Sequence, residues 1–271
     1  MIHTNKNIGI TFSGGGTKGI AHAGVLKYFE EIQINPTMIS ATSAGAIVGS
    51  LYAWGFKPEQ ILEFVQKIDF FRWKYFTLRK AGFIDSQAFR SVFESIFGNT
   101  KIGDLDMKLY ICATDMVRNR IKIFDAKSTI VDAILASCAF PGVMSPHVVN
   151  NIIYSDGGIL NHFPTDIIQG RCDYIIGSYV SPLQKVDDKY LNSIKNVMSH
   201  ALDLMQHQIN QNKFRMCDIL IQPKELATYS TFETNKQIMG KIYDIGYQSA
   251  KNAFENLDIE ISNSIITDKS I

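Results

Sequence analysis

Residues 11–20, TFSGGGTKGI, place three consecutive glycines and then a fourth between two contrasting segments. The segment before them (7–12) is apolar and typical of a buried strand, and the segment after them (19–32) has the apolar spacing of a helix. Glycines at such a junction let backbone N–H groups come very close to a negative charge. That charge is either a permanent phosphate or an oxygen that becomes negative only during a reaction.

On both sides of this loop, strand-like and helix-like segments alternate along the chain. Strands are expected at 37–40, 108–115, 120–125, 172–180 and 217–223, with a hairpin over 148–158 that turns at Asn150-Asn151. Helices are expected at 43–55, 85–98, 128–142, 187–211 and 234–256. This alternation predicts an α/β fold, a three-layer α/β/α sandwich around a largely parallel central sheet. Since no linker-like segment interrupts it, we expect a single domain over residues 1–271 with its core at about 7–256.

The composition excludes several classes of protein. A net charge of +1 lacks the basic excess typical of nucleic-acid binding, so no nucleic-acid partner is expected. The four cysteines lie far apart and form no CxxC pair, which argues against a zinc site. No acidic loop has calcium-binding spacing, so we expect no metal and no cofactor. Without a long apolar segment, the sequence indicates neither a secretory signal nor a membrane span, and we expect a cytoplasmic protein.

The glycine loop first suggests a phosphate site. Gly14, Gly16 and Gly19 satisfy the G-x-G-x-x-G pattern of dinucleotide-binding proteins. Such a site also needs an acidic residue about 20 positions further on, at the end of the second strand. The sequence there is ATSAG (41–45), with no carboxylate. A nucleotide-binding protein and a plain strand-to-helix turn remain as alternatives for this loop.

The ATSAG segment has the small-x-Ser-x-small form of a nucleophile elbow, with Ser43 between a strand and a buried helix. The alternative is that Ser43 only caps the helix. Because the carboxyl ends of neighbouring parallel strands meet at one edge of a sheet, the hydroxyl and the glycine amides are expected side by side. A nucleophile next to donors aimed at a developing negative oxygen is what acyl transfer needs.

A base for the serine is offered by YSDGG (154–158). Asp156 ends a predicted strand, and Gly157 and Gly158 permit close approach. An ordinary Asp-Gly turn is the alternative. His162 follows six residues later, so a Ser43–Asp156–His162 triad in the chain order of α/β-hydrolases also stays open.

Four motifs together resemble a known family. GGGTKG (14–19), ATSAG (41–45), ASCAFPG (136–142) and DGG (156–158) are similar in order and spacing to those of patatin-like phospholipases, over residues 8 to about 182. The resemblance implies a Ser–Asp dyad, in which Ser43 is the nucleophile and Asp156 the general base. It also implies an oxyanion hole made by the amides of Gly14, Gly15 and Gly16. The motif residues that would support this site are Thr17, Lys18, Gly19, Gly45, Gly157 and Gly158.

The resemblance further implies a hydrolase that releases fatty acid from acyl esters of lipids through an acyl-enzyme. Ala41 departs from the family pattern, which has glycine there, and its methyl group would crowd the elbow. A catalytically silent lipid-binding or regulatory protein with the same fold is therefore an alternative. The oligomeric state is not indicated.

A contact with the membrane surface is suggested by residues 68–83, IDFFRWKYFTLRKAGF. This stretch mixes aromatic with basic side chains, a composition that suits the membrane–water interface. A core-packing segment with solvated charges is the alternative. We expect a lipid or other acyl-ester substrate, with peripheral membrane contact through this stretch.

Overall fold

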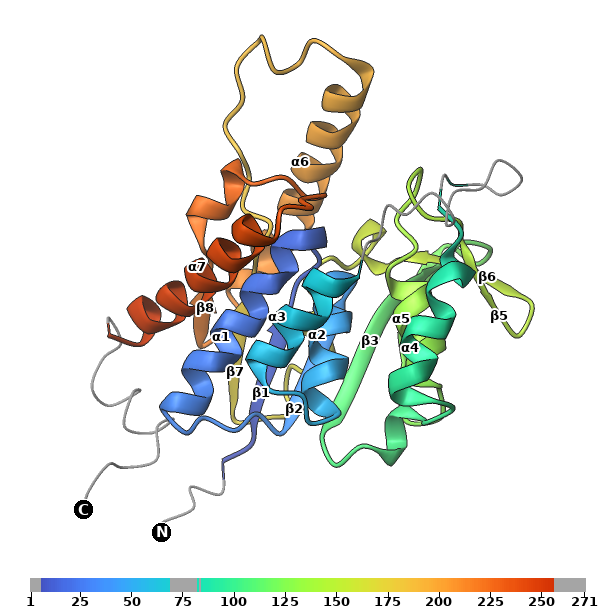
Figure 1. The fold of residues 1–271 in the computed structure, drawn as a ribbon, viewed down its shortest axis with the longest axis vertical. Helices are drawn as coiled ribbons and strands as arrows, with labels where there is room; N and C mark the ends of the chain where they lie inside the picture. The colour runs from blue at the N-terminus through green and yellow to red at the C-terminus, as the bar shows by residue number, and fades with distance from the viewer. Residues whose placement is uncertain (1–5, 69–81, 83, 256–271) are drawn as a thin grey trace.

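The computed structural model describes residues 6–68, 82 and 84–255, which form an eight-stranded sheet with flanking helices (Figure 1). The strand order is β5-β6-β3-β2-β1-β7-β8, and β4 pairs with β3. The pairs β1–β2, β1–β7, β2–β3 and β7–β8 are parallel, whereas β4, β5 and β6 run antiparallel to their partners. The strands are β1 (Ile8–Phe12), β2 (Met38–Thr42), β3 (Lys108–Asp115), β4 (Arg120–Phe124), β5 (His147–Val149), β6 (Ile152–Asp156), β7 (Tyr174–Ser178) and β8 (Ile219–Ile221).

Helices cover the sheet as the alternating pattern predicts. In Figure 1, α1, α2, α3 and α7 lie together over one face, where α1 packs against α3 and α7. On the other face, Met38, Cys112 and Ile175 form a smaller apolar cluster with Ile167 and Ile168. The predicted α/β sandwich with a largely parallel sheet is therefore confirmed. The helices are α1 (Ile20–Glu31), α2 (Ala44–Ala53), α3 (Pro58–Lys67), α4 (Arg90–Phe97), α5 (Ile130–Ser137), α6 (Ile194–Phe214) and α7 (Lys236–Glu255).

Alternation along the central strands explains this layering. Ile8, Ile10 and Phe12 of β1 belong to the main core cluster, while Gly9 approaches Ile168 and Cys172 on the other face. Both faces of β1 are buried, as its continuous apolar sequence predicts. The hairpin is confirmed too, since Asn150 and Asn151 have φ values of 51° and 61°, which suit a tight two-residue turn.

Three elements differ from the sequence expectations. Helix α3 was not predicted, although Pro58 occupies its first position, where proline is favourable. Helix α5 ends at Ser137 rather than near Pro141, because proline has no N–H to donate to the carbonyl four residues before it, here that of Ser137. Helix α6 begins at Ile194 rather than 187, where the Ser193 side chain accepts a hydrogen bond from the amide of Asn196.

Helix α6 projects beyond the body of the molecule at the top of Figure 1. Although it has 21 residues, neither it nor any other helix in the described part of the chain is long and apolar enough to cross a membrane. Of the predicted membrane-contacting stretch 68–83, all but Ile68 and Gly82 lie outside the described residues.

Candidate active site

Ser43 stands in a sharp turn between β2 and α2. Its backbone has φ 53° and ψ −122°, a conformation that residues other than glycine rarely adopt. The Ser43 side chain makes no capping hydrogen bond to α2, so capping does not explain why serine is found here. Strain of about 1–3 kcal/mol at such a position persists only when the surroundings enforce it.

The turn is enforced by close packing around its small residues. A Cβ atom added to Gly45 would stand 2.6 Å from the carbonyl oxygen of Ser13. A Cβ on Gly19 would stand 2.5 Å from the Cβ of Ala44, so these glycines allow the loops after β1 and β2 to meet. Ala41 is fully buried, and a Cβ on Gly49 would lie 3.6 Å from its methyl group, an ordinary contact distance. The methyl group of Ala41 therefore leaves ordinary contact distance toward α2 at Gly49.

Asp156 ends β6 and is only 2% exposed. Its Oδ1 atom accepts a hydrogen bond from the amide of Gly158 at 2.7 Å. Burial raises the pKa of Asp156 to about 6, while hydrogen bonding from the Ser43 hydroxyl and the Gly158 amide lowers it. The second oxygen, Oδ2, has no well-aligned hydrogen bond with any described residue. The carboxyl group thus lies close enough to Ser43 for the serine hydroxyl to affect its pKa, and among the described residues its Oδ2 atom has no hydrogen-bond partner.

The two glycines after Asp156 fit the turn into a confined space. A side chain on Gly157 would collide with the carbonyl of Cys112, which lies within β3. A Cβ on Gly158 would stand 3.0 Å from both the Asp156 carboxyl and the His162 ring. These contacts explain why the turn has no side chains here.

The segment 136–142 lies between Ser43 and Asp156 and holds both. The Ser137 hydroxyl accepts a hydrogen bond from the amide of Ser43 at 2.8 Å and donates one to the carbonyl of Cys112. The carbonyl of Ala139 accepts the amide of Asp156 at 3.0 Å. Sequence reasoning assigned no role to Ser137 or Ala139; the only signal was that the ASCAFPG motif accompanied the other three.

The glycine loop presents two open amides. The Gly14 amide donates to the carbonyl of His162 at 3.1 Å, and the Thr17 amide donates to the carbonyl of Thr231 at 2.9 Å. Among the described residues, the amides of Gly15 and Gly16 have no acceptor. Gly14 itself faces the elbow, since a Cβ built on it would lie 3.4 Å from the Cβ of Ser43. Two free donors therefore lie on the loop beside Ser43.

His162 lies between the glycine loop and the Asp156 turn. Its ring approaches Gly14 and Gly158, and burial lowers its pKa to about 3. Among the described residues, its buried Nε2 atom has no hydrogen-bond partner, and neither ring nitrogen forms a hydrogen bond with Ser43 or Asp156. These contacts favour a packing role for His162, between the glycine loop and the Asp156 turn, over a role in a Ser43–Asp156–His162 triad.

Comparison with known proteins adds to this geometry. The family model described as patatin-like phospholipase matches residues 10–168, more than half of the 271 residues. The chain belongs to the patatin-like phospholipase family. Its motif residues Gly14–Gly19, Ser43 and Asp156 all fall inside the matched region.

Relatives of this patatin-like chain include much longer proteins. Lysophospholipase NTE1 of Meyerozyma guilliermondii is 25% identical over 254 residues, which cover 89% of this chain but 17% of that protein. An uncharacterized NTE family protein of Mycobacterium tuberculosis is 26% identical over 175 residues, 62% of this chain and 29% of that protein. This chain therefore spans about a sixth to less than a third of the length of these relatives.

Among solved structures, VipD from Legionella pneumophila has a similar fold. The TM-score is 0.64 at 16% sequence identity, over 92% of this chain and 66% of that chain. At this identity the likeness supports the patatin fold alone.

Two further side chains approach the candidate site, one from the glycine loop and one from α6. Lys18 is 8% exposed and has no carboxylate oxygen within 4 Å among the described residues. Burial lowers the pKa of Lys18, and the charge of Asp203 on α6 partly opposes this. From the same helix, the side-chain amide of Gln206 donates to the carbonyl of Gly158 at 3.2 Å. Helix α6 thus reaches both the glycine loop and the Asp156 turn.

Proposed function

We propose that this patatin-like protein is a serine acyl hydrolase of the phospholipase A, lysophospholipase or esterase type. It would cleave fatty-acyl esters of lipids through a Ser43–Asp156 dyad. The observation that carries this proposal is the meeting of three groups at one edge of the sheet. They are the Ser43 hydroxyl in a strained elbow, the buried Asp156 carboxyl and the open amides of Gly15 and Gly16.

In the proposed reaction, Asp156 takes the proton of the Ser43 hydroxyl as Oγ attacks the acyl carbon. The carbonyl oxygen becomes negative and accepts hydrogen bonds from the amides of Gly15 and Gly16. The C–O bond of the ester then breaks, and Asp156 returns the proton to the leaving alcohol. Water attacks the acyl-enzyme, Asp156 accepts its proton, and the fatty acid leaves as Ser43 recovers its hydroxyl hydrogen.

The environment of Asp156 supports its role as base. A free aspartate is a weak base, but a pKa of about 6 brings it close to neutral pH, where proton transfer in both directions is efficient. The open Oδ2 atom is available to receive the proton. The Gly158 amide holds Oδ1 and fixes the plane of the carboxyl group.

A lipid surface is the proposed source of the substrate. The exposed large apolar residues of α6 are Ile194, Val197, Met198, Leu202, Leu204, Met205 and Ile209. The opposite side of the helix carries the buried Asn210 and also Gln206, whose side-chain amide reaches Gly158 in the Asp156 turn. A helix whose apolar side faces outward and whose polar side contacts the site would hold a bilayer next to the site.

Peripheral membrane contact through residues 68–83 is a second proposal.

Labelling with a fluorophosphonate probe, alongside hydrolysis of a soluble p-nitrophenyl ester, tests the proposed chemistry. We expect Ser43→Ala to abolish labelling and Asp156→Asn to lower kcat by about 10⁴-fold or more, each with the fold intact by circular dichroism. Ser50→Ala is a matched control, because the Ser50 hydroxyl is buried in α2 and has no hydrogen-bond partner in the part of the chain that the structure describes.

Labelling that survives Ser43→Ala would contradict the assignment of the nucleophile. A wild-type protein that is neither labelled nor active would instead favour the silent lipid-binding alternative. Tight binding of a dinucleotide would favour the phosphate-site alternative for the glycine loop.

A further inference from the structure

The carbonyl group of Gly14 is held by two hydroxyl groups. Ser13 Oγ donates to it at 2.8 Å, and Ser181 Oγ donates to it at 3.0 Å. Ser13 Oγ also accepts a hydrogen bond from the amide of Val180 at 3.0 Å. This carbonyl and the open amide of Gly15 belong to the same peptide group.

The direction of the Gly15 amide follows from this arrangement. In a trans peptide the C=O and N–H bonds point in opposite directions. Val180 and Ser181 follow β7, and β1 lies between β7 and β2 in the sheet. A Gly14 carbonyl that is bonded on the β7 side leaves the Gly15 N–H pointing toward the β2 side, where Ser43 ends the strand.

The buried side chain of His22 forms a hydrogen bond with Ser13, the residue before the three glycines. His22 is fully buried, and its Nε2 atom lies 2.9 Å from the carbonyl of Ser13. Since a carbonyl only accepts, Nε2 carries the hydrogen, and Nδ1 accepts from the Ser178 hydroxyl at 2.8 Å. Ser13 is thus held through its carbonyl, its hydroxyl and its amide, which donates to Ser178. The start of the glycine loop has little freedom to rotate.

We propose that Ser13 and Ser181 are positioning residues that build the oxyanion hole by fixing the Gly14–Gly15 peptide. If this peptide rotated, the Gly14 carbonyl would replace the Gly15 N–H beside the reacting oxygen and repel it. The two hydroxyl donors favour the productive orientation, because they bond to the carbonyl only when it points toward β7. This inference rests on the proposed hydrolase function, and it assigns two residues that no sequence motif indicated for this role.

The test compares Ser181→Ala, Ser181→Thr and the control Ser50→Ala, with a soluble p-nitrophenyl ester as substrate. We expect Ser181→Ala to lower kcat about tenfold and to leave KM nearly unchanged, since the lost support acts on the transition state. The affinity for a trifluoromethyl ketone, which forms a tetrahedral oxyanion on the serine, should fall by a similar factor. Ser181→Thr keeps the hydroxyl donor and should restore both quantities, while Ser50→Ala should change neither.

The outcomes separate this inference from the proposed function. An active wild type with a Ser181→Ala variant of equal kcat and ketone affinity would overturn the role of Ser181 alone. Failure of Ser181→Thr to restore the kcat lost in Ser181→Ala would also overturn it, because the effect would then be one of packing. A wild type without hydrolysis or labelling overturns the proposed function, and this inference with it, since no oxyanion would form. Ser13→Ala is the second variant and is expected to lower kcat and ketone affinity in the same way.

Discussion

At the scale of single residues, the site depends on burial as much as on chemistry. Asp156 is buried, and its pKa is raised by loss of hydration rather than by a neighbouring negative charge. Its amide and carbonyl are held by Ala139 and Thr114, so the carboxyl is placed by the backbone on both sides. The same burial lowers the pKa of His162 to about 3 and leaves that ring neutral. One environment therefore makes the carboxyl a better base and the histidine a poor one.

The pH dependence of ester hydrolysis follows from this environment. In the proposed reaction Asp156 must be unprotonated to accept the serine proton, so kcat/KM should fall as the pH drops below about 6. The decline should be about tenfold per pH unit for a single group. Initial rates with a soluble ester between about pH 4.5 and about pH 8.5 measure it, with circular dichroism confirming the fold at each pH. A rate that stays constant down to about pH 4.5 would contradict Asp156 as the base.

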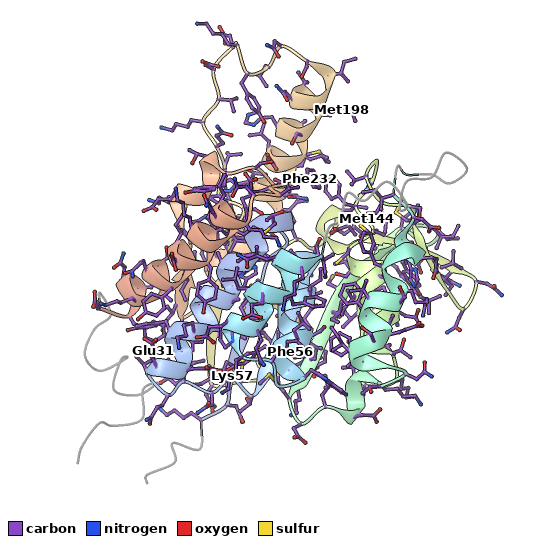
Figure 2. All side chains as sticks on the ribbon, viewed as in Figure 1. Glu31, Phe56, Lys57, Met144, Met198 and Phe232 are labelled. Atoms are coloured by element: carbon purple, nitrogen blue, oxygen red, sulfur yellow. The ribbon has the colours of Figure 1, made fainter. Side chains whose placement is uncertain are left out.

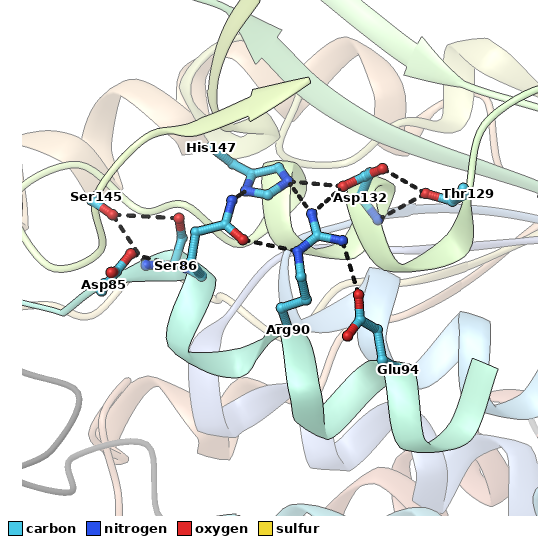
Figure 3. A network of polar contacts seen from close by, with 9 residues as sticks. Asp85, Ser86, Arg90, Glu94, Thr129, Asp132, Ser145 and His147 are labelled. Atoms are coloured by element: carbon cyan, nitrogen blue, oxygen red, sulfur yellow. Dashed lines mark hydrogen bonds and ion pairs between the residues drawn. The ribbon is translucent and has the colours of Figure 1, made fainter. Parts of the chain in front are cut away.

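At the scale of elements, a polar network ties together the parts that carry the site (Figure 3). Asp132 of α5 contacts His147 of β5 at 3.2 Å, Arg90 of α4 and the Thr129 hydroxyl. Helix α5 leads to Ser137, which holds the Ser43 amide, and β5 pairs with β6, which ends at Asp156. The network therefore connects α5, which supports Ser43, to β5, which supports the strand that ends at Asp156.

Loss of this network should destabilise the fold, most of all at neutral pH. Hydrogen bonding to His147, and then to Arg90 and Thr129, holds the pKa of Asp132 well below its usual value. The stabilisation is therefore present above about pH 4 and is lost on acidification. Asp132→Asn should lower the free energy of unfolding by about 1–3 kcal/mol at neutral pH, as measured by urea denaturation.

Glu94→Gln provides the matched control for Asp132→Asn. Glu94 contacts the same Arg90 at 3.2 Å but is largely exposed, so its loss should cost less than about 0.5 kcal/mol. If both substitutions lowered the free energy of unfolding equally, the buried contacts of Asp132 would contribute no more to stability than the exposed contact of Glu94.

At the scale of the whole molecule, α6 is placed in an unusual way for an amphipathic helix. Its polar side contacts the body, where Lys213 pairs with Asp166 at 2.8 Å and Gln206 reaches Gly158. Its apolar side faces outward, and Met198, which is 62% exposed, lies on the projecting part of the helix in Figure 2. Leu204, Met205 and Ile209 line a shallow hollow on the same helix. This apolar surface beside the site fits the proposed approach of a lipid surface.

Replacing the apolar side of α6 with charge should weaken binding to membranes. We expect the double variant Met198→Glu and Met205→Glu to lose most of its co-sedimentation with phosphatidylcholine vesicles, because each glutamate would have to enter an apolar layer. Hydrolysis of a soluble ester should stay within about twofold of the wild type, since neither methionine contacts the dyad.

Val148→Glu is the control for the α6 variant, because Val148 is also exposed, at 52%, but lies on β5. Vesicle binding that the α6 substitutions leave unchanged would contradict the proposed membrane contact. A dimer in solution that dissociates on these substitutions would identify a second copy of the chain as the partner instead.

Residue patterns alone indicated the fold class and the local turns of the candidate site. Apolar periodicity is a local property, so it indicated the strands and most helices, although α3 was missed. The glycine loop, the elbow and the Asp-Gly-Gly turn were also readable, because each needs small or polar residues at adjacent positions. Family motifs then indicated which of these turns belong together.

The groups that support the candidate site, and the exposed face of α6, became apparent only in the folded arrangement. Ser181 holds a loop 167 residues away in the chain, and Ser137 holds the Ser43 amide from 94 residues away. Such contacts have no local pattern, because their partners meet only when the sheet brings strand ends together. Periodicity showed α6 to be a helix but could not show that its apolar side faces outward, since that depends on what the polar side can reach in the folded molecule.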